Sequence, residues 1–119
     1  MKKEKITISD SGAVVVPESV SMRAFEIADL FGVYIQTVDA NIKAIIKSEV
    51  VSPDTSGQVI VNGGFVIPLD FGLEMITALA FRIKSKNAEV FREWLMKKAV
   101  KRDIATTIVL TTKNTNIFN

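Results

Sequence analysis

The feature that most constrains this sequence is a helical pattern of apolar residues that one glycine interrupts. Residues 25–46 read FEIADLFGVYIQTVDANIKAII, with Gly32 near the middle. Before the glycine, apolar residues recur with the i, i+3, i+4, i+7 spacing of one helical face. These residues are Ala24, Ile27, Ala28 and Phe31. Glycine ends helices because it adopts a left-handed backbone at little cost. The pattern therefore predicts two short helices, the first starting near residue 22 with Ser21 as its N-cap.

The second helix is predicted over residues 35–47, and its two faces differ in character. The face expected to be buried carries Ile35, Val38, Ile42 and Ile45. The opposite face carries Gln36, Ala40, Lys43 and Lys47. Asp39 lies at the edge of that polar face. An amphipathic helix of this kind packs on a core and leaves its polar side to a partner or to water.

These two helices have the features of a DNA-reading helix-turn-helix. Such a motif needs a small residue where the helices cross and a turn of about three residues, and its second helix enters the major groove. Ala28 fits the crossing, and residues 32–34 fit the turn. Helix-turn-helices also serve as plain scaffolds. A protein-interaction module that uses this scaffold without DNA is therefore the alternative prediction.

If the second helix reads DNA, its outward residues make the contacts. Gln36 lies early on the helix, where a side chain can reach the edge of a base. Lys43 and Lys47 follow about two and three turns later and are expected to hold phosphates. Tyr34, in the turn, could touch a phosphate or a protein partner. A reader of this kind usually binds two half-sites, so we expect double-stranded DNA as the ligand and a homodimer as the reader.

The charge distribution complicates the DNA hypothesis. Residues 20–51 carry three Lys or Arg against four Asp or Glu, so this segment alone neutralises few phosphates. Asp39 should weaken binding further. The C-terminal third is basic, with nine Lys or Arg against three Asp or Glu in residues 82–119. Arg92, Lys97 and Lys101 would add phosphate contacts only if the fold brings them to the same side. Otherwise these cations are exposed to water and interact favourably with the dipole at the C-terminal end of their helix.

The rest of the chain predicts an α+β fold with a winged helix-turn-helix-like core. Asn62-Gly63-Gly64 predicts a tight hairpin that would be the wing. Asn87 is expected to cap the last helix, whose Phe91, Trp94 and Leu95 should pack in the core. One domain, 1–119, is predicted to contain an N-terminal β-hairpin (1–17), the helix-turn-helix (22–47), the wing hairpin (57–69), two C-terminal helices (72–102) and a strand or tail (103–119).

Composition argues against catalysis. The chain has neither histidine nor cysteine, so a hydrolytic triad and the usual metal ligands cannot be assembled. Its carboxylates show no metal-ligand spacing. We therefore predict no enzyme activity, no metal and no cofactor. No apolar run reaches about 18 residues, so no membrane span is expected. The N-terminal MKKEKITISD has no apolar segment after its lysines, so a cytoplasmic protein is expected.

Two blocks of the sequence resemble RhuM-like proteins. The first block comprises EIADLFGV (26–33) and TVDANIKAI (37–45), and the second is EMITALAFRIKSKNAEVFREWL (74–95). The resemblance implies a winged-helix-like domain related to DNA binding, of bacterial or mobile-element origin, without a defined activity. The chain departs from the family pattern at two positions. Arg23 stands where a threonine usually begins the first helix, and Asp39 stands where serine is common on the recognition helix.

Overall fold

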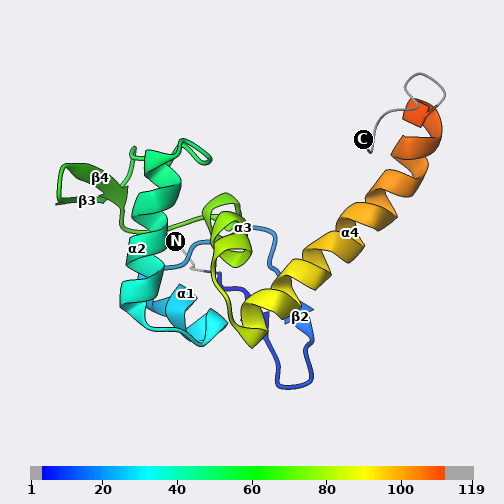
Figure 1. The fold of residues 1–119 in the computed structure, drawn as a ribbon, viewed down its shortest axis with the longest axis horizontal. Coiled ribbons are helices and arrows are strands. Elements are labelled where there is room, and N and C mark those ends of the chain that lie inside the picture. Colours follow the sequence, from blue (N-terminus) through cyan, green and yellow to red (C-terminus); the bar gives the residue numbers. More distant parts are fainter. Residues whose placement is uncertain (1–3, 112–119) are drawn as a thin grey trace.

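The computed structural model describes residues 4–111, and for residue 62 and residues 101–111 it describes the backbone alone. This part of the chain has an α+β fold with two small antiparallel hairpins and four helices (Figure 1). In chain order the elements are β1 (Thr7–Ile8), β2 (Val14–Val15), α1 (Ala24–Phe31), α2 (Ile35–Lys47), β3 (Val59–Asn62), β4 (Phe65–Pro68), α3 (Leu73–Arg82) and α4 (Lys86–Thr111).

The break between α1 and α2 falls at the expected glycine. Gly32 has φ 68° and ψ 40°, a left-handed conformation that ends α1. Its backbone N–H donates to the carbonyl of Asp29, and the N–H of Val33 donates to that of Ala28. These bonds satisfy carbonyl groups that the end of a helix leaves without partners. The prediction that Gly32 separates two helices is confirmed.

The start of α1 differs from the prediction. Arg23, not Ser21, occupies the N-cap, and its backbone N–H donates to Glu26 Oε1 at 2.8 Å. The reason lies in a distant segment. Met22 forms an antiparallel bridge with Phe71, which holds the chain extended up to the residue before the cap. The expected helix start at residue 22 is therefore two residues too early.

The core lies where α1, α2, α3 and the first turns of α4 meet. Ala28 and Val38 are both buried, as the helix-pair pattern predicts. Ile35 departs from the pattern because 41% of its surface is exposed at the first turn of α2. The largest fully buried side chains are Phe31, Phe91, Met22, Ile27, Ile42, Ile45, Ile76, Leu79, Ile83 and Val38.

The β3–β4 hairpin has the tight turn that its sequence predicts. Gly63 and Gly64 have φ values of 57° and 82°, which residues with a Cβ rarely adopt. Positive φ at both central residues matches the right-handed twist of the flanking strands. The register therefore pairs Asn62 with Phe65 and Val59 with Pro68. In Figure 1 the hairpin lies beside α2, at the opposite end of the molecule from the C-terminal half of α4.

The start of α4 is capped by a different residue from the one expected. Ser85 Oγ accepts a hydrogen bond from the N–H of Ala88 at 3.1 Å, so the serine is the capping side chain. Asn87 instead donates from Nδ2 to the carbonyl of Leu30 at 2.9 Å. That carbonyl belongs to the last turn of α1 and has no acceptor role within the helix. The asparagine therefore ties the start of α4 to the end of α1.

Helix α4 is longer than the sequence suggested. It continues to Thr111, so the strand or tail expected from residue 103 onward is wrong for residues 103–111, while residues 112–119 lie outside the described part. No glycine or proline follows Asn87 before Thr111. β-Branched residues lower helix propensity only slightly, so nothing in this stretch ends the helix. Figure 1 shows α4 running away from the rest of the fold.

Candidate nucleic-acid interface

The N-terminal end of α2 presents an aromatic and an amide side chain to solvent. Tyr34 is the N-cap residue, and its carbonyl accepts from the N–H groups of Thr37 and Val38 at 3.0 and 3.3 Å. This backbone role fixes the residue while its side chain stays 81% exposed. Gln36, two residues later, is exposed as well. Both residues are therefore available to a ligand that approaches this end of the helix.

The two predicted lysines follow on the same side of α2. Because an α-helix turns every 3.6 residues, Gln36, Lys43 and Lys47 lie along one face. Lys47 is exposed, whereas Lys43 is half-buried and lines a hollow next to the β3–β4 hairpin. Asp39 is exposed and lines the same hollow. The carboxylate therefore lies beside the lysines, as the sequence indicated.

The predicted cations of α4 do not join this face. Arg92 is occupied by the fold, because its Nη1 donates to the carbonyl oxygens of Ala80 and Ile83 at 2.6 and 2.9 Å. Lys97 is exposed, and it and Lys101 belong to the C-terminal half of α4 or border it. That half of the helix leads away from α2 (Figure 1). The condition for a shared phosphate-binding surface is therefore not met.

An apolar hollow separates α2 from the β3–β4 hairpin. Its volume is about 260 Å³, and the N-terminal turn of α1 forms its third wall. Phe25 lines it and is 54% exposed. The other apolar residues of its lining are Ile35, Ile42, Ile60, Ile67, Pro68, Leu69 and Phe71, with Ala24 beside them. Sequence reasoning missed this feature, although Phe25 lies outside the i, i+3, i+4, i+7 set of α1 and so had no place in the core.

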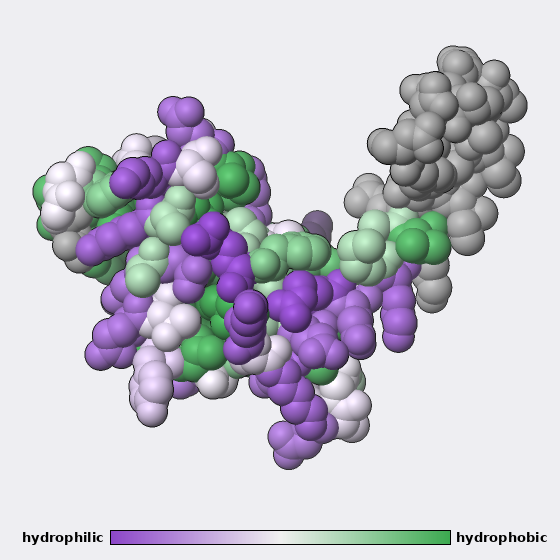
Figure 2. Space-filling model, in the orientation of Figure 1, coloured by the Kyte–Doolittle hydropathy of each residue, from purple (hydrophilic) through white to green (hydrophobic). Residues whose placement is uncertain are grey.

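The segment that follows α2 adds no positive charge to the interface. No Lys or Arg occurs between Lys47 and Arg82, while this segment contains four acidic residues. The hairpin therefore cannot neutralise phosphates. In Figure 2 the hairpin region carries green, hydrophobic surface among purple and white residues. The hairpin offers mainly apolar side chains, and Val61 is 74% exposed.

Two arginines near α2 were not assigned to the interface from the sequence. Arg82 donates from Nε to Asn41 Oδ1 at 3.0 Å, which places it against α2. Arg23 lines the same hollow as Lys43, and its Nε lies 3.7 Å from Asp70 Oδ1. Because Arg82 lies far from α2 in the sequence, only the tertiary structure brings it next to that helix. Both arginines are candidate phosphate ligands in addition to the lysines.

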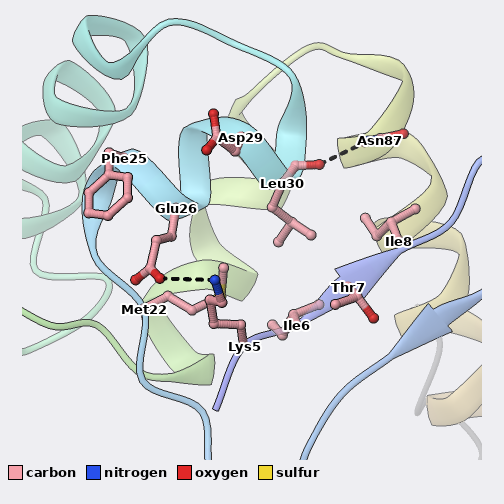
Figure 3. A pocket seen from close by; sticks show the side chains of 10 residues that line it. All are labelled: Lys5, Ile6, Thr7, Ile8, Met22, Phe25, Glu26, Asp29, Leu30 and Asn87. Atoms are coloured by element: carbon pink, nitrogen blue, oxygen red, sulfur yellow. Dashed lines mark hydrogen bonds and ion pairs between the residues drawn. The ribbon is translucent and has the colours of Figure 1, made fainter. Parts of the chain in front are cut away.

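A second hollow lies between β1 and α1, and three of the polar side chains that line it, Lys5, Glu26 and Asn87, make contacts within the fold (Figure 3). Lys5 Nζ lies 3.4 Å from Glu26 Oε2, and the other oxygen of Glu26 accepts from the N-cap of α1. The Asn87 bond to Leu30 forms part of another wall. These contacts join the N-terminal strand and α4 to α1, so we assign them a structural role.

The described residues were also compared with the requirements of a metal site and of a membrane span. Among the side chains that the structure describes, no group of three or more Asp or Glu could hold a metal ion. None of the helices in the described part of the chain has both the length and the apolar character needed to cross a membrane. Comparison with models of known protein families, with curated proteins and with solved structures finds no match to this chain.

Proposed function

We propose that this chain is a non-catalytic, cytoplasmic DNA-binding protein in which α1 and α2 form a helix-turn-helix and β3–β4 forms its wing. The proposal agrees with the resemblance to RhuM-like proteins. Helix α2 is the reading helix, and two copies of the chain bind two half-sites. Arg92 has no part in this proposal because it caps α3, and Lys97 and Lys101 have none because α4 leads away.

One observation carries the proposal. The solvent side of α2 combines an exposed amide in its first turn with lysines about two and three turns later, and the three share a face. Gln36 can form two hydrogen bonds with an adenine in the major groove, worth about 1–3 kcal/mol of discrimination. Lys43 and Lys47 are placed to hold phosphates along the groove edge. Tyr34 adds a hydroxyl group at the helix start.

A second function is favoured by a different observation. The hollow between α2 and the hairpin is apolar, and the hairpin carries no cation. Phe25 and Ile35 are exposed beside it although they are large apolar residues. A protein partner that buries these side chains would use the same helix pair as a scaffold. This is the alternative function, and it requires no DNA.

Salt-dependent titration of a mixed-sequence duplex with the full chain tests the DNA proposal. The logarithm of the association constant should fall linearly with the logarithm of salt concentration, by about 0.9 per neutralised phosphate. Lys43→Ala with Lys47→Ala should weaken binding and flatten this slope by up to about 1.8. The matched control is Lys84→Ala with Lys86→Ala, which removes the same charge from two exposed residues, one between α3 and α4 and one at the start of α4.

The control pair separates a specific surface from general charge loss. If α2 binds the duplex, the control should change the slope much less than the α2 pair. Equal changes in both double variants would contradict the assignment to α2. If the wild-type chain binds no duplex at low salt, the protein-partner function replaces the DNA proposal.

A further inference from the structure

Helix α4 extends beyond the body that its first turns pack against. Among the side chains of α4 that the structure describes, which end at residue 100, Trp94 and Leu95 are the last half-buried ones, and residues 96–100 are all exposed. At about 1.5 Å per residue, the 26 residues of α4 span roughly 39 Å. More than half of that length therefore lies past the core. A helical segment without packing is marginal in water, so a stable α4 requires a surface that covers it.

An exposed apolar strip begins where α4 leaves the body. Met96 and Val100 are four residues apart on one face and are 56% and 57% exposed. Phe81, at the end of α3, is 56% exposed and lines the same surface hollow as Met96. We call Phe81, Met96 and Val100 the α4 strip. Single exposed apolar residues are ordinary, but a strip that continues from one helix to the next is typical of an interface.

The charges beside the strip have a definite order. Glu89 and Glu93 line the hollow on its N-terminal side, and Lys97 lines it on the C-terminal side. All three residues are exposed. Among the described side chains none of the three makes an ion pair, although Glu93 and Lys97 have the i, i+4 spacing for one. Arg92 also lines the hollow, but its Nη1 is bonded to two carbonyl oxygens at the end of α3. The exposed charges on this face of α4 are thus acidic before the apolar centre and basic after it.

Because of this order, the charges on the face match those of a second copy of α4 that runs in the opposite direction. A two-fold axis near residue 95 would place Glu93 of each copy opposite Lys97 of the other, with Met96 close to the axis. A parallel pair in register would instead place Glu93 against Glu93 and Lys97 against Lys97, which costs energy. We propose that the partner of the α4 strip is a second copy of this chain, with the two α4 helices packed antiparallel. This dimer does not depend on DNA binding.

Cysteine cross-linking tests the contact and its direction. The chain has no cysteine, so a single introduced thiol reports on one position. Met96→Cys should give a covalent dimer under mild oxidation, because residues near the axis face their own copies within disulfide reach. Val100→Cys should cross-link poorly, since an antiparallel pair places the two copies about 15 Å apart along the helix. The matched control is Val15→Cys, an equally exposed valine on β2.

Charge reversal combined with analytical ultracentrifugation tests the pairing independently. The full wild-type chain should be dimeric at tens of micromolar. Glu93→Lys and Lys97→Glu should each raise the Kd of the dimer about tenfold. A mixture of the two variants should form heterodimers with near wild-type affinity. Circular dichroism should show unchanged folding, because both residues are exposed.

Several results would overturn the proposal. A wild-type chain that stays monomeric at these concentrations rules out the dimer and leaves the strip to a different protein. Equal cross-linking through Met96→Cys and Val100→Cys indicates a parallel pair, and equal cross-linking through Val15→Cys indicates random collision. Duplex titration of the wild-type chain keeps the two ideas distinct. A dimer that binds no duplex contradicts the DNA proposal alone, and a monomer that binds duplex contradicts the α4 dimer alone.

Discussion

Arg92 of α4 donates a hydrogen bond from Nη1 to the carbonyl oxygen of Ala80 in α3, at 2.6 Å. The same nitrogen donates to the carbonyl of Ile83 at 2.9 Å. Both carbonyls lie at the C-terminal end of α3, where backbone oxygens lack partners within the helix. A positive charge at this end also interacts favourably with the helix dipole. Arg92 therefore joins two helices, and its charge is not available to a nucleic acid.

Arg92→Met should lower the free energy of unfolding by about 1.5–3 kcal/mol, because it leaves those carbonyls without a charged donor. Urea denaturation followed by circular dichroism measures the change. Lys86→Met is the matched control, since it removes an exposed cation from the same helix and should stay within about 0.5 kcal/mol. Similar midpoints for the two variants would show that the Arg92 bonds contribute little.

Gly32→Ala should lower the free energy of unfolding by about 1–2 kcal/mol, because alanine must then adopt the left-handed conformation that ends α1. An added Cβ would meet no atom within 4 Å, so conformation and not crowding is the cause. Gly57→Ala provides the control, since Gly57 also has open space around it but no positive φ. The prediction fails if both variants unfold at the same urea concentration.

Phe91→Ala should destabilise the protein more than Trp94→Ala. Phe91 is fully buried, so Phe91→Ala should lower the free energy of unfolding by about 3–5 kcal/mol. Trp94 is only half-buried, with its ring stacked on Phe91 at 5.8 Å and Lys98 Nζ 5.5 Å from its centre. Thermal or urea unfolding of both variants gives the order. Because Trp94 is the chain's single tryptophan, its fluorescence in Phe91→Ala should also change.

Asp39→Ser should tighten duplex binding by about threefold to tenfold at low salt, because it removes a negative charge beside Lys43. Fluorescence anisotropy with a labelled duplex measures the affinity. Asp29→Ser removes the same charge from an exposed position on α1 and should have a smaller effect. An unchanged affinity in Asp39→Ser would mean that DNA does not approach this face of α2.

Ser56→Ala should raise the pKa of the Asp54 carboxyl group toward its ordinary value. The Ser56 hydroxyl and its N–H donate to Asp54 Oδ1 at 2.6 and 3.0 Å, and these bonds lower that pKa. A lowered pKa in the folded state means that the stabilisation is present above the unfolded-state pKa and is lost as pH falls through the folded value. Carboxyl titration by NMR would show no shift in Ser56→Ala if the hydroxyl bond were unimportant.

Local sequence was enough to predict the elements whose geometry is set by a few neighbouring residues. Gly32 ends α1 and Gly63-Gly64 turns the β3–β4 hairpin because glycine adopts positive φ at little cost. The bounds of α2 follow from the helical period of its apolar residues. The polar face of α2, with Gln36 and Lys47 exposed, follows from the same period.

The tertiary structure decided where the remaining side chains act. Local sequence predicts a DNA contact for Arg92, yet its side chain bonds a carbonyl of α3. It predicts a helix cap for Asn87, yet this side chain bonds a carbonyl of α1. Helix α4 continued because the β-branched content of its C-terminal half sets only a weak local preference. The hollow beside α2 forms from segments of α1, α2 and the hairpin that are separate in sequence. The bonding partner of a side chain and the walls of a hollow depend on which distant residues packing brings together. The helical or strand period of a sequence carries no information about these long-range contacts.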